Sequence, residues 1–254
     1  MVRFADITWV DADALRGSVD VVLVPVGSTE QHGPHAPLGT DTILAEYLAN
    51  TVAERTGVII TPAIPIGVSD HHRQFTGTLW VTHQVFREYA KEVALSVASH
   101  GWRKVLYVNG HGGNSPSLLE VCEDLRRSHG VFAAVVNAYP PRPDGHAGRD
   151  ETSIMLNLRP ELVKMECAPD TSQSSQFAGI PMRGQGIGPA EYGWDTIDLS
   201  TTGVFGAAGK TIRASTATPE HGEKIMNQYV SEVVELVEKL KKARLEELLP
   251  RLHV

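Results

Sequence analysis

The sequence predicts an α/β protein, a three-layer αβα sandwich built around a mostly parallel central sheet. Short aliphatic runs alternate along the chain with longer stretches of helical periodicity, and these runs are apolar at nearly every position. A parallel sheet produces this pattern because helices cover both of its faces. The chain has 254 residues and no Ser/Gly-rich or highly charged linker, so we expect one domain spanning residues 1–254.

The first part of the chain opens with the aliphatic run at 21–26, which is too short for a helix and is expected to form a buried strand. A helix is predicted at 41–55, with Gly57 as its C-terminal stop, and a second strand is predicted at 58–61. Residues 62–78 are rich in Pro and Gly and form a long connection. Loops of this length are often functional.

The middle of the chain continues the alternation. The expected elements, in order, are a helix at 84–100, a strand at 104–108, a helix at 115–128, a strand at 131–136, a loop at 137–150 and a helix at 151–158. Each strand is separated from the next by a helical stretch, which is the connection that parallel neighbours require.

The C-terminal part carries one candidate motif and one long helix. Residues 203–211, GVFGAAGKT, are similar to a phosphate-binding loop, but Val204 stands where the first glycine is required. The TIRAST that follows predicts a strand rather than a helix, so we do not expect a phosphate-binding loop. Residues 219–249 have one apolar stripe and are predicted to form a helix that covers the core.

Composition excludes several classes of function. The net charge is −7 and the pI is near 5.9, which argues against a nucleic-acid or anionic membrane surface because phosphate binding needs clustered Lys and Arg. About 18 consecutive apolar residues would be needed to span a membrane, and no such run is present. Without a recognisable signal sequence, and with Cys122 and Cys167 too few for a disulfide framework, we expect a cytoplasmic protein.

Polar side chains follow three of the predicted strands. Glu30 and His32 follow the strand at 21–26, Asp41 comes nine positions later, and His111 lies in NGHGGN after the strand at 104–108. The carboxyl ends of parallel strands meet at one edge of a sheet, where ligands bind. We therefore expect these side chains in one cleft, together with the residues that follow the strand at 131–136, namely His146 and Glu151. Carboxylates and imidazoles that converge in this way are ligands for a divalent metal.

Each of these residues also has a structural interpretation. The glycines around His111 allow a tight turn, and Asp41 and Glu151 lie where helices begin, a place that favours carboxylates through the helix dipole. The joint pattern decides between the two interpretations, because five potential ligands at three strand ends are improbable as separate structural accidents. A metal site is the better hypothesis.

Four motifs together resemble the creatininase family of metal-dependent amidohydrolases. They are GSTEQHGPHAPLGTD, the FTGT loop, NGHGGN and GHAGRDETS, and the similarity runs from about residue 3 to about residue 240. The resemblance implies a binuclear metal centre in an αβα domain, assembled into a homohexamer. It also implies roles for five positions: Glu30 and His32 each bind one metal, Asp41 bridges both, His111 completes the first site, and His146 is the catalytic histidine.

The sequence departs from creatininase itself at two places. Gly113 stands where creatininase supplies a glutamate to the second metal, and Glu151 is the natural replacement ligand. Arg142 and Pro143 stand where creatininase has the Trp-Asp pair that holds creatinine, so we do not expect creatinine to be the substrate.

The resemblance and the chemistry of the site predict a hydrolase that acts on a carbon–nitrogen bond other than a peptide bond, in a cyclic amide or a formamide. Two divalent ions (Zn, Mn or Fe) bound by three carboxylates would carry a formal charge of +1, which one bridging hydroxide neutralises. Metal binding lowers the pKa of water from 15.7 to about 7, which supplies that hydroxide as the nucleophile. We expect His146 to protonate the leaving nitrogen, with Glu151 as a possible second proton carrier, and His72 and Gly112 to contact the small-molecule substrate.

Other functions fit the same motifs. Relatives deformylate a formamidopyrimidine ribonucleotide in flavin and deazaflavin synthesis or trim a peptide in mycofactocin maturation. Arg73, Arg142 and Arg149 could meet an anionic substrate or could be solvated loop charges. A metal-bound subunit without turnover is a further alternative, against which the intact ligand set and His146 argue.

Overall fold

The central sheet of the protein has five parallel strands. The computed structural model describes residues 2–140, 144–184 and 186–251. The strands stand in the spatial order β1-β3-β2-β4-β5, and every neighbouring pair is parallel. Their bounds are β1 (Val2–Arg3), β2 (Val21–Val26), β3 (Ile59–Ile60), β4 (Lys104–Asn109) and β5 (Phe132–Asn137). The parallel sheet is thus confirmed, with the edge strand β1 as an addition that the sequence pattern did not predict.

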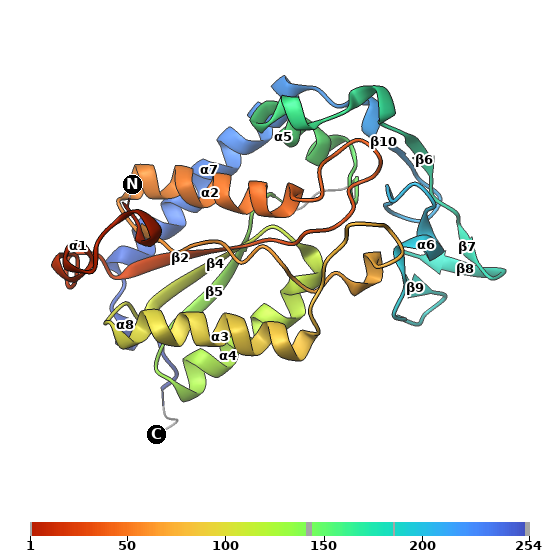
Figure 1. The fold of residues 1–254 in the computed structure, drawn as a ribbon. Helices are drawn as coiled ribbons and strands as arrows, with labels where there is room; N and C mark the ends of the chain where they lie inside the picture. The colour runs from red at the N-terminus through yellow and green to blue at the C-terminus, as the bar shows by residue number, and fades with distance from the viewer. Residues whose placement is uncertain (1, 141–143, 185, 252–254) are drawn as a thin grey trace.

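Helices cover both faces of this sheet, as Figure 1 shows. One layer consists of α2 (Thr40–Thr56), α5 (Arg149–Leu158) and α7 (Pro219–Lys242), and the other of α3 (His83–Ser99) and α4 (Ser115–Ser128). Along β2 the side chains alternate between the two layers, because Leu23 packs into the core under α2 and α7 while Val22 and Val24 pack under α3 and α4. The three-layer αβα prediction is confirmed.

The C-terminal helix is shorter than predicted. Helix α7 ends at Lys242, and a separate helix, α8 (Leu245–Leu248), follows instead of one helix to residue 249. The buried Lys104 ammonium group at the start of β4 explains the break, because it donates to Leu240 O at 2.9 Å and Ala243 O at 2.5 Å. These carbonyl groups at the end of α7 thereby receive partners from outside the helix.

Residues 170–213, which we call the cover segment, lie beyond the loops that follow the sheet strands (Figure 1). The segment holds only short elements: β6 (Asp170–Ser172), β7 (Gln176–Phe177), β8 (Ile180–Arg183), β9 (Gly186–Ile187), α6 (Thr196–Leu199) and β10 (Thr211–Arg213). Strand β10 confirms the predicted strand after GKT and pairs with β6 in antiparallel fashion. Helix α1 (Trp9–Ala14) lies near the N-terminus. Among the described residues, no helix is long and apolar enough to cross a membrane.

Candidate metal centre

The six residues singled out at the strand ends lie together in the structure. Glu30 and His32 follow β2, His111 follows β4, Asp41 is in the first turn of α2 and Glu151 is in the first turn of α5. All five are at most 4% exposed, and the side chain of His146, in the loop after β5, is 14% exposed. The parallel sheet therefore brings residues that are distant in sequence to one edge, as its topology requires.

Two glycines make this convergence possible. A Cβ atom at Gly27 would lie 2.2 Å from Thr42 Oγ1, and one at Gly110 would lie 2.0 Å from Asp41 O. Distances under about 3 Å are not sterically allowed, so only glycine lets the ends of β2 and β4 approach the first turn of α2 this closely. The approach sets His111 beside Asp41.

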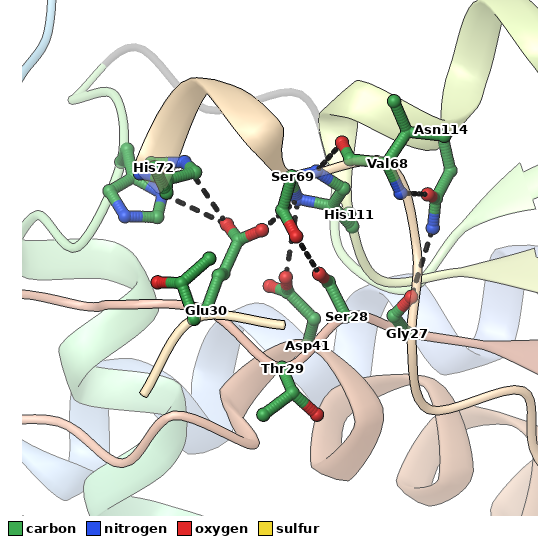
Figure 2. A network of polar contacts seen from close by, with 12 residues as sticks. Gly27, Ser28, Thr29, Glu30, Asp41, Val68, Ser69, His72, His111 and Asn114 are labelled. Atoms are coloured by element: carbon green, nitrogen blue, oxygen red, sulfur yellow. Dashed lines mark hydrogen bonds and ion pairs between the residues drawn. The ribbon is translucent and has the colours of Figure 1, made fainter. Parts of the chain in front are cut away.

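Two groups of potential ligands share one carboxylate. Glu30, Asp41 and His111 form one group, and His32, Asp41 and Glu151 form the other, with the ligand atoms of each group within 4.8 Å of one another. Asp41 Oδ2 lies 3.3 Å from His111 Nδ1, and Asp41 Oδ1 lies 3.2 Å from His32 Nε2. The two oxygen atoms of Asp41 thus face different groups, which is the arrangement of a bridging ligand (Figure 2 shows the first group).

Backbone carbonyl groups orient both imidazoles. His111 Nε2 donates to Val68 O at 2.8 Å, and His32 Nδ1 donates to Glu30 O at 3.2 Å. The other ring nitrogen of each histidine then faces the carboxylates, as a metal ligand must. Asn114 fixes the first of these contacts, because its side chain holds Val68 N at 2.9 Å and Gly27 O at 3.0 Å (Figure 2).

Several buried polar atoms in the centre have no hydrogen-bond partner among the described residues: both carboxylate oxygens of Glu30, Asp41 Oδ2 and His32 Nε2. Burying such atoms without a partner is costly, and a bound divalent cation removes the cost. A donor set of carboxylate oxygens and imidazole nitrogens fits Zn, Mn or Fe. The residues present therefore fit a metal site.

The charges of the carboxylates and imidazoles compensate one another through protons. Burial raises the pKa of Glu30 to about 7. Burial also acts to raise the pKa of Asp41, but the charges of His32 and His111 outweigh it and lower that pKa to about 2. For His111 burial acts to lower the pKa, and the charges of Glu30 and Asp41 reverse this and raise it to about 10. Protonated imidazoles thus balance the carboxylate charges, and metal binding would release their protons.

His146 is oriented by the chain segment that carries the ligands. Its Nε2 lies 2.9 Å from Gln31 O, to which only an N–H can donate, so Nδ1 is the nitrogen that faces Glu30 Oε1 at 3.9 Å. Burial, followed by the charge of His32, lowers the pKa of His146 to about 3, which keeps the imidazole neutral. With Glu30 and His32 it also forms a third group of potential ligands.

Gly113 and Glu151, the two positions compared with creatininase, differ in the space around them. A Cβ atom at Gly113 would lie 2.3 Å from Val68 O and 2.4 Å from His111 Nε2, so the backbone here has no room for a side chain. Glu151 Oε1 instead lies 3.8 Å from His32 Nε2, while its Oε2 accepts a hydrogen bond from Ala147 N at 2.7 Å.

The remaining candidates divide into cavity residues and others. Gly112 lines the cavity over the centre, and a Cβ atom there would have open space. His72 is 1% exposed, with Nε2 at 3.3 Å from Glu30 Oε1. Arg73 pairs with Asp195, and Arg149 is exposed at the start of α5. Arg142 and Pro143 lie outside the described residues.

The cavity has a volume of about 930 Å³ and two kinds of wall. Asp41, His111, His146 and Glu151 line its floor, and the cover segment contributes Tyr192, Trp194 and Phe205. The Trp194 ring meets His71 edge-on, with centroids 5.1 Å apart, and lies 5.3 Å from Phe205. The sequence analysis missed this aromatic wall because the elements around it are too short to show a periodic pattern.

Comparisons with known proteins agree with this geometry. The family model described as Creatininase, creatinine amidohydrolase, matches residues 5–237. The mycofactocin precursor peptide peptidase of Mycolicibacterium smegmatis is 34% identical over 226 residues, which covers 85% of this chain and 84% of the relative. The creatinine amidohydrolase of Pseudomonas putida is 30% identical over 199 residues, 66% of this chain and 76% of the relative. A solved structure titled "Creatininase Mn" has a TM-score of 0.77 at 25% identity and covers 95% of this chain and 99% of its own.

Proposed function

The chain belongs to the creatininase family of hydrolases, and from this premise we propose that it hydrolyses a carbon–nitrogen amide bond with two divalent metal ions. Glu30, Asp41 and His111 would hold one ion, and His32, Asp41 and Glu151 the other. The observation that carries the proposal is the pair of ligand groups that share Asp41, one oxygen facing each group. Zn, Mn and Fe all suit this donor set.

When bound, two such ions supply a hydroxide at neutral pH and a Lewis acid for the carbonyl oxygen. Hydrolysis places the hydroxyl oxygen on the carbonyl carbon and a proton on the leaving nitrogen as the carbon–nitrogen bond breaks. We assign that proton transfer to His146: its neutral ring presents the lone pair of Nδ1 to the centre, so Nδ1 can take the proton of the attacking hydroxyl group and pass it to the leaving nitrogen. Glu151 is the second candidate proton carrier. Its Oε2 accepts a hydrogen bond from the amide of Ala147, four residues earlier in the chain.

The size of the cavity bears on the substrate. Ligand pockets range from about 300 to about 1,000 Å³, and the volume here, about 930 Å³, is near the upper end. A small ring such as creatinine would leave most of it empty. The volume favours a short peptide as a second candidate substrate, in agreement with the name of the mycofactocin precursor peptide peptidase relative.

A formamidopyrimidine ribonucleotide remains a third candidate, although both terminal nitrogens of Arg73 are held by Asp195 and are not offered to its phosphate. The buried ligands and the oriented His146 support catalysis over a metal-bound subunit without turnover. The small-molecule substrate, the homohexamer, the cytoplasmic location and the absence of nucleic-acid or membrane partners stay predictions.

A panel assay tests the proposal. Purified protein would be offered creatinine, a formamidopyrimidine and a short peptide, before and after chelation and after addition of Zn, Mn or Fe. We expect cleavage of one compound, lost on chelation and restored by metal. Cleavage that survives complete removal of metal would contradict the metal-dependent mechanism.

The variant His146→Ala separates proton transfer from metal binding. General acid–base groups contribute about 10²- to 10⁴-fold to rate, so turnover should fall by that factor while the metal content stays the same. Full turnover in this variant would remove His146 from the mechanism.

A further inference from the structure

His72 and Gln31 form a buried hydrogen-bonded pair beside the metal ligand Glu30. Gln31 is 4% exposed, and its Oε1 accepts a hydrogen bond from Gly33 N at 2.9 Å. This contact identifies the other amide atom, Nε2, as the donor. Gln31 Nε2 lies 2.8 Å from His72 Nδ1, 3.1 Å from Gly203 O and 3.0 Å from His146 Nε2; because His146 Nε2 itself donates to Gln31 O, the two amide hydrogens go to His72 and Gly203.

The pair determines which nitrogen of His72 carries the proton. Because Gln31 Nε2 can only donate, His72 Nδ1 must accept, and a neutral ring then carries its hydrogen on Nε2. Thr196 Oγ1 contacts the same Nδ1 at 2.7 Å and acts there as a second donor. His72 Nε2 lies 3.3 Å from Glu30 Oε1, as Figure 2 shows, which places its N–H beside that oxygen.

The two oxygens of Glu30 thus face different partners. Oε1 faces His72, and Oε2 lies 2.9 Å from His111 Nδ1, on the side of the group that contains Asp41. A ligand carboxylate held at one oxygen keeps the other in place for a metal, and outer contacts of this kind tune metal affinity. His72 is 1% exposed and lines the cavity, with its Nδ1 held by Gln31 and Thr196.

We propose that His72 is a positioning residue that orients the metal ligand Glu30, and that Thr196 of the cover segment, with Gln31, holds His72 in the required tautomer. The proposal rests on the proposed function, because it assumes that Glu30 binds a metal. Through Thr196 the cover segment would help to build the metal centre, in addition to lining the cavity.

The attachment of the cover segment supports this assignment. Asp195, the residue before Thr196, accepts two hydrogen bonds from Arg73 at 2.5 Å each, and Arg73 follows His72 in sequence. Asp195 also caps α6 through a capping box with Asp198. Two consecutive residues of the cover segment therefore hold two consecutive residues of the loop that faces Glu30.

The test is a Zn²⁺ titration of the full chain after its metal has been stripped, with a chromophoric chelator as competitor. Loss of an outer contact costs about 10- to 100-fold in metal affinity, so we expect that weakening in Thr196→Val, which keeps the side-chain shape and removes the hydroxyl donor. Thr196→Ser restores the donor and should restore the affinity. Thr171→Val is the matched control, since Thr171 pairs with Thr202 in the same segment.

A second pair of variants tests His72 directly. His72→Gln keeps an N–H donor near the position of Nε2, whereas His72→Leu removes it, so zinc affinity should fall more in the leucine variant. Equal zinc affinity in wild type, Thr196→Val and His72→Leu, with folding verified by circular dichroism, would overturn the positioning role alone. A wild-type chain that binds no zinc would instead overturn the proposed function.

Discussion

The floor of the cavity and the cover segment differ in how they are built. The floor is formed by Asp41, His111 and Glu151, which follow a parallel strand or lie in the first turns of α2 and α5 and are at most 4% exposed, and by His146, whose side chain is 14% exposed. The cover segment presents the partly exposed rings of Tyr192 and Trp194 and the buried ring of Phe205, all three outside its short strands and helix. The difference indicates that the sheet edge fixes the chemistry and that the cover segment controls what reaches it.

The largest effect is expected from the shared carboxylate of the floor. Asp41→Asn removes the charge that faces both ligand groups, so both ions should be lost. Metal catalysis is worth several kcal/mol, which corresponds to a fall in turnover of at least about 10³-fold. Elemental analysis and turnover measure the two effects, with Glu54→Gln, an exposed carboxylate of the same helix, as control. Retention of both ions would show that Asp41 does not bridge them.

A smaller loss should follow when only one ligand group is changed. Glu151→Gln removes a charge from the group that contains His32 and leaves the group of Glu30 and His111 intact. We expect the metal content to fall from about two ions per chain to about one, with a loss of turnover of about 10²- to 10⁴-fold. The control is Asp150→Asn, whose carboxylate pairs with His221. An unchanged metal content would leave Glu151 as a proton carrier only.

The cover segment should show a different pattern. Trp194→Ala removes an aromatic wall worth about 0.5–1.5 kcal/mol per ring contact, which corresponds to a rise in KM of about 2- to 13-fold. The metal content and kcat should change little, because Trp194 lies outside the three groups of potential ligands found among the described residues. Steady-state kinetics on the compound cleaved in the panel measures this, with Trp9→Ala as control, since Trp9 is 81% exposed elsewhere. A fall in kcat alone would contradict the division between floor and cover.

The smallest effect concerns pH in the metal-free protein. The pKa of His111 is raised to about 10 from an ordinary 6.5, so the folded state keeps a proton that the unfolded state releases. The stability this contributes is fully present below about pH 6.5 and is lost as the pH rises toward about 10. The raised pKa of Glu30 acts in the same direction between 4.5 and about 7. We expect the Tm of the chelated protein to fall from about pH 6.5 to about pH 9 more than the Tm of the zinc-loaded protein, as measured by calorimetry. The same slope in both forms would contradict the exchange of protons for metal.

The sequence predicted the parts of the molecule whose pattern is local. The strand at 21–26 was located correctly because it is buried on both faces and therefore apolar throughout. The helices at 41–55, 84–100 and 115–128 agree with α2, α3 and α4 to within a residue at each end, since their periodicity is long and their stops are clear. The C-terminal helix was too long because its end depends on Lys104, a contact across 136 residues.

The same distinction applies to the site. The convergence of Glu30, His32 and His111 followed from strand order alone, because parallel strands end at one edge. The contact of Thr196 with His72 joins residues 124 positions apart through a helix of four residues, and no local pattern encodes it. The roles assigned to these residues as ligands and proton carriers stay predictions.

Anomalous diffraction from crystals grown with Mn²⁺ tests the central claim most directly. We expect two peaks about 3.5–4 Å apart, the spacing of two-metal sites, with one oxygen of Asp41 on each ion and with His111 and Glu151 on opposite sides. A single peak, or a peak held by Glu30, His32 and His146 without Asp41, would contradict the shared-carboxylate centre.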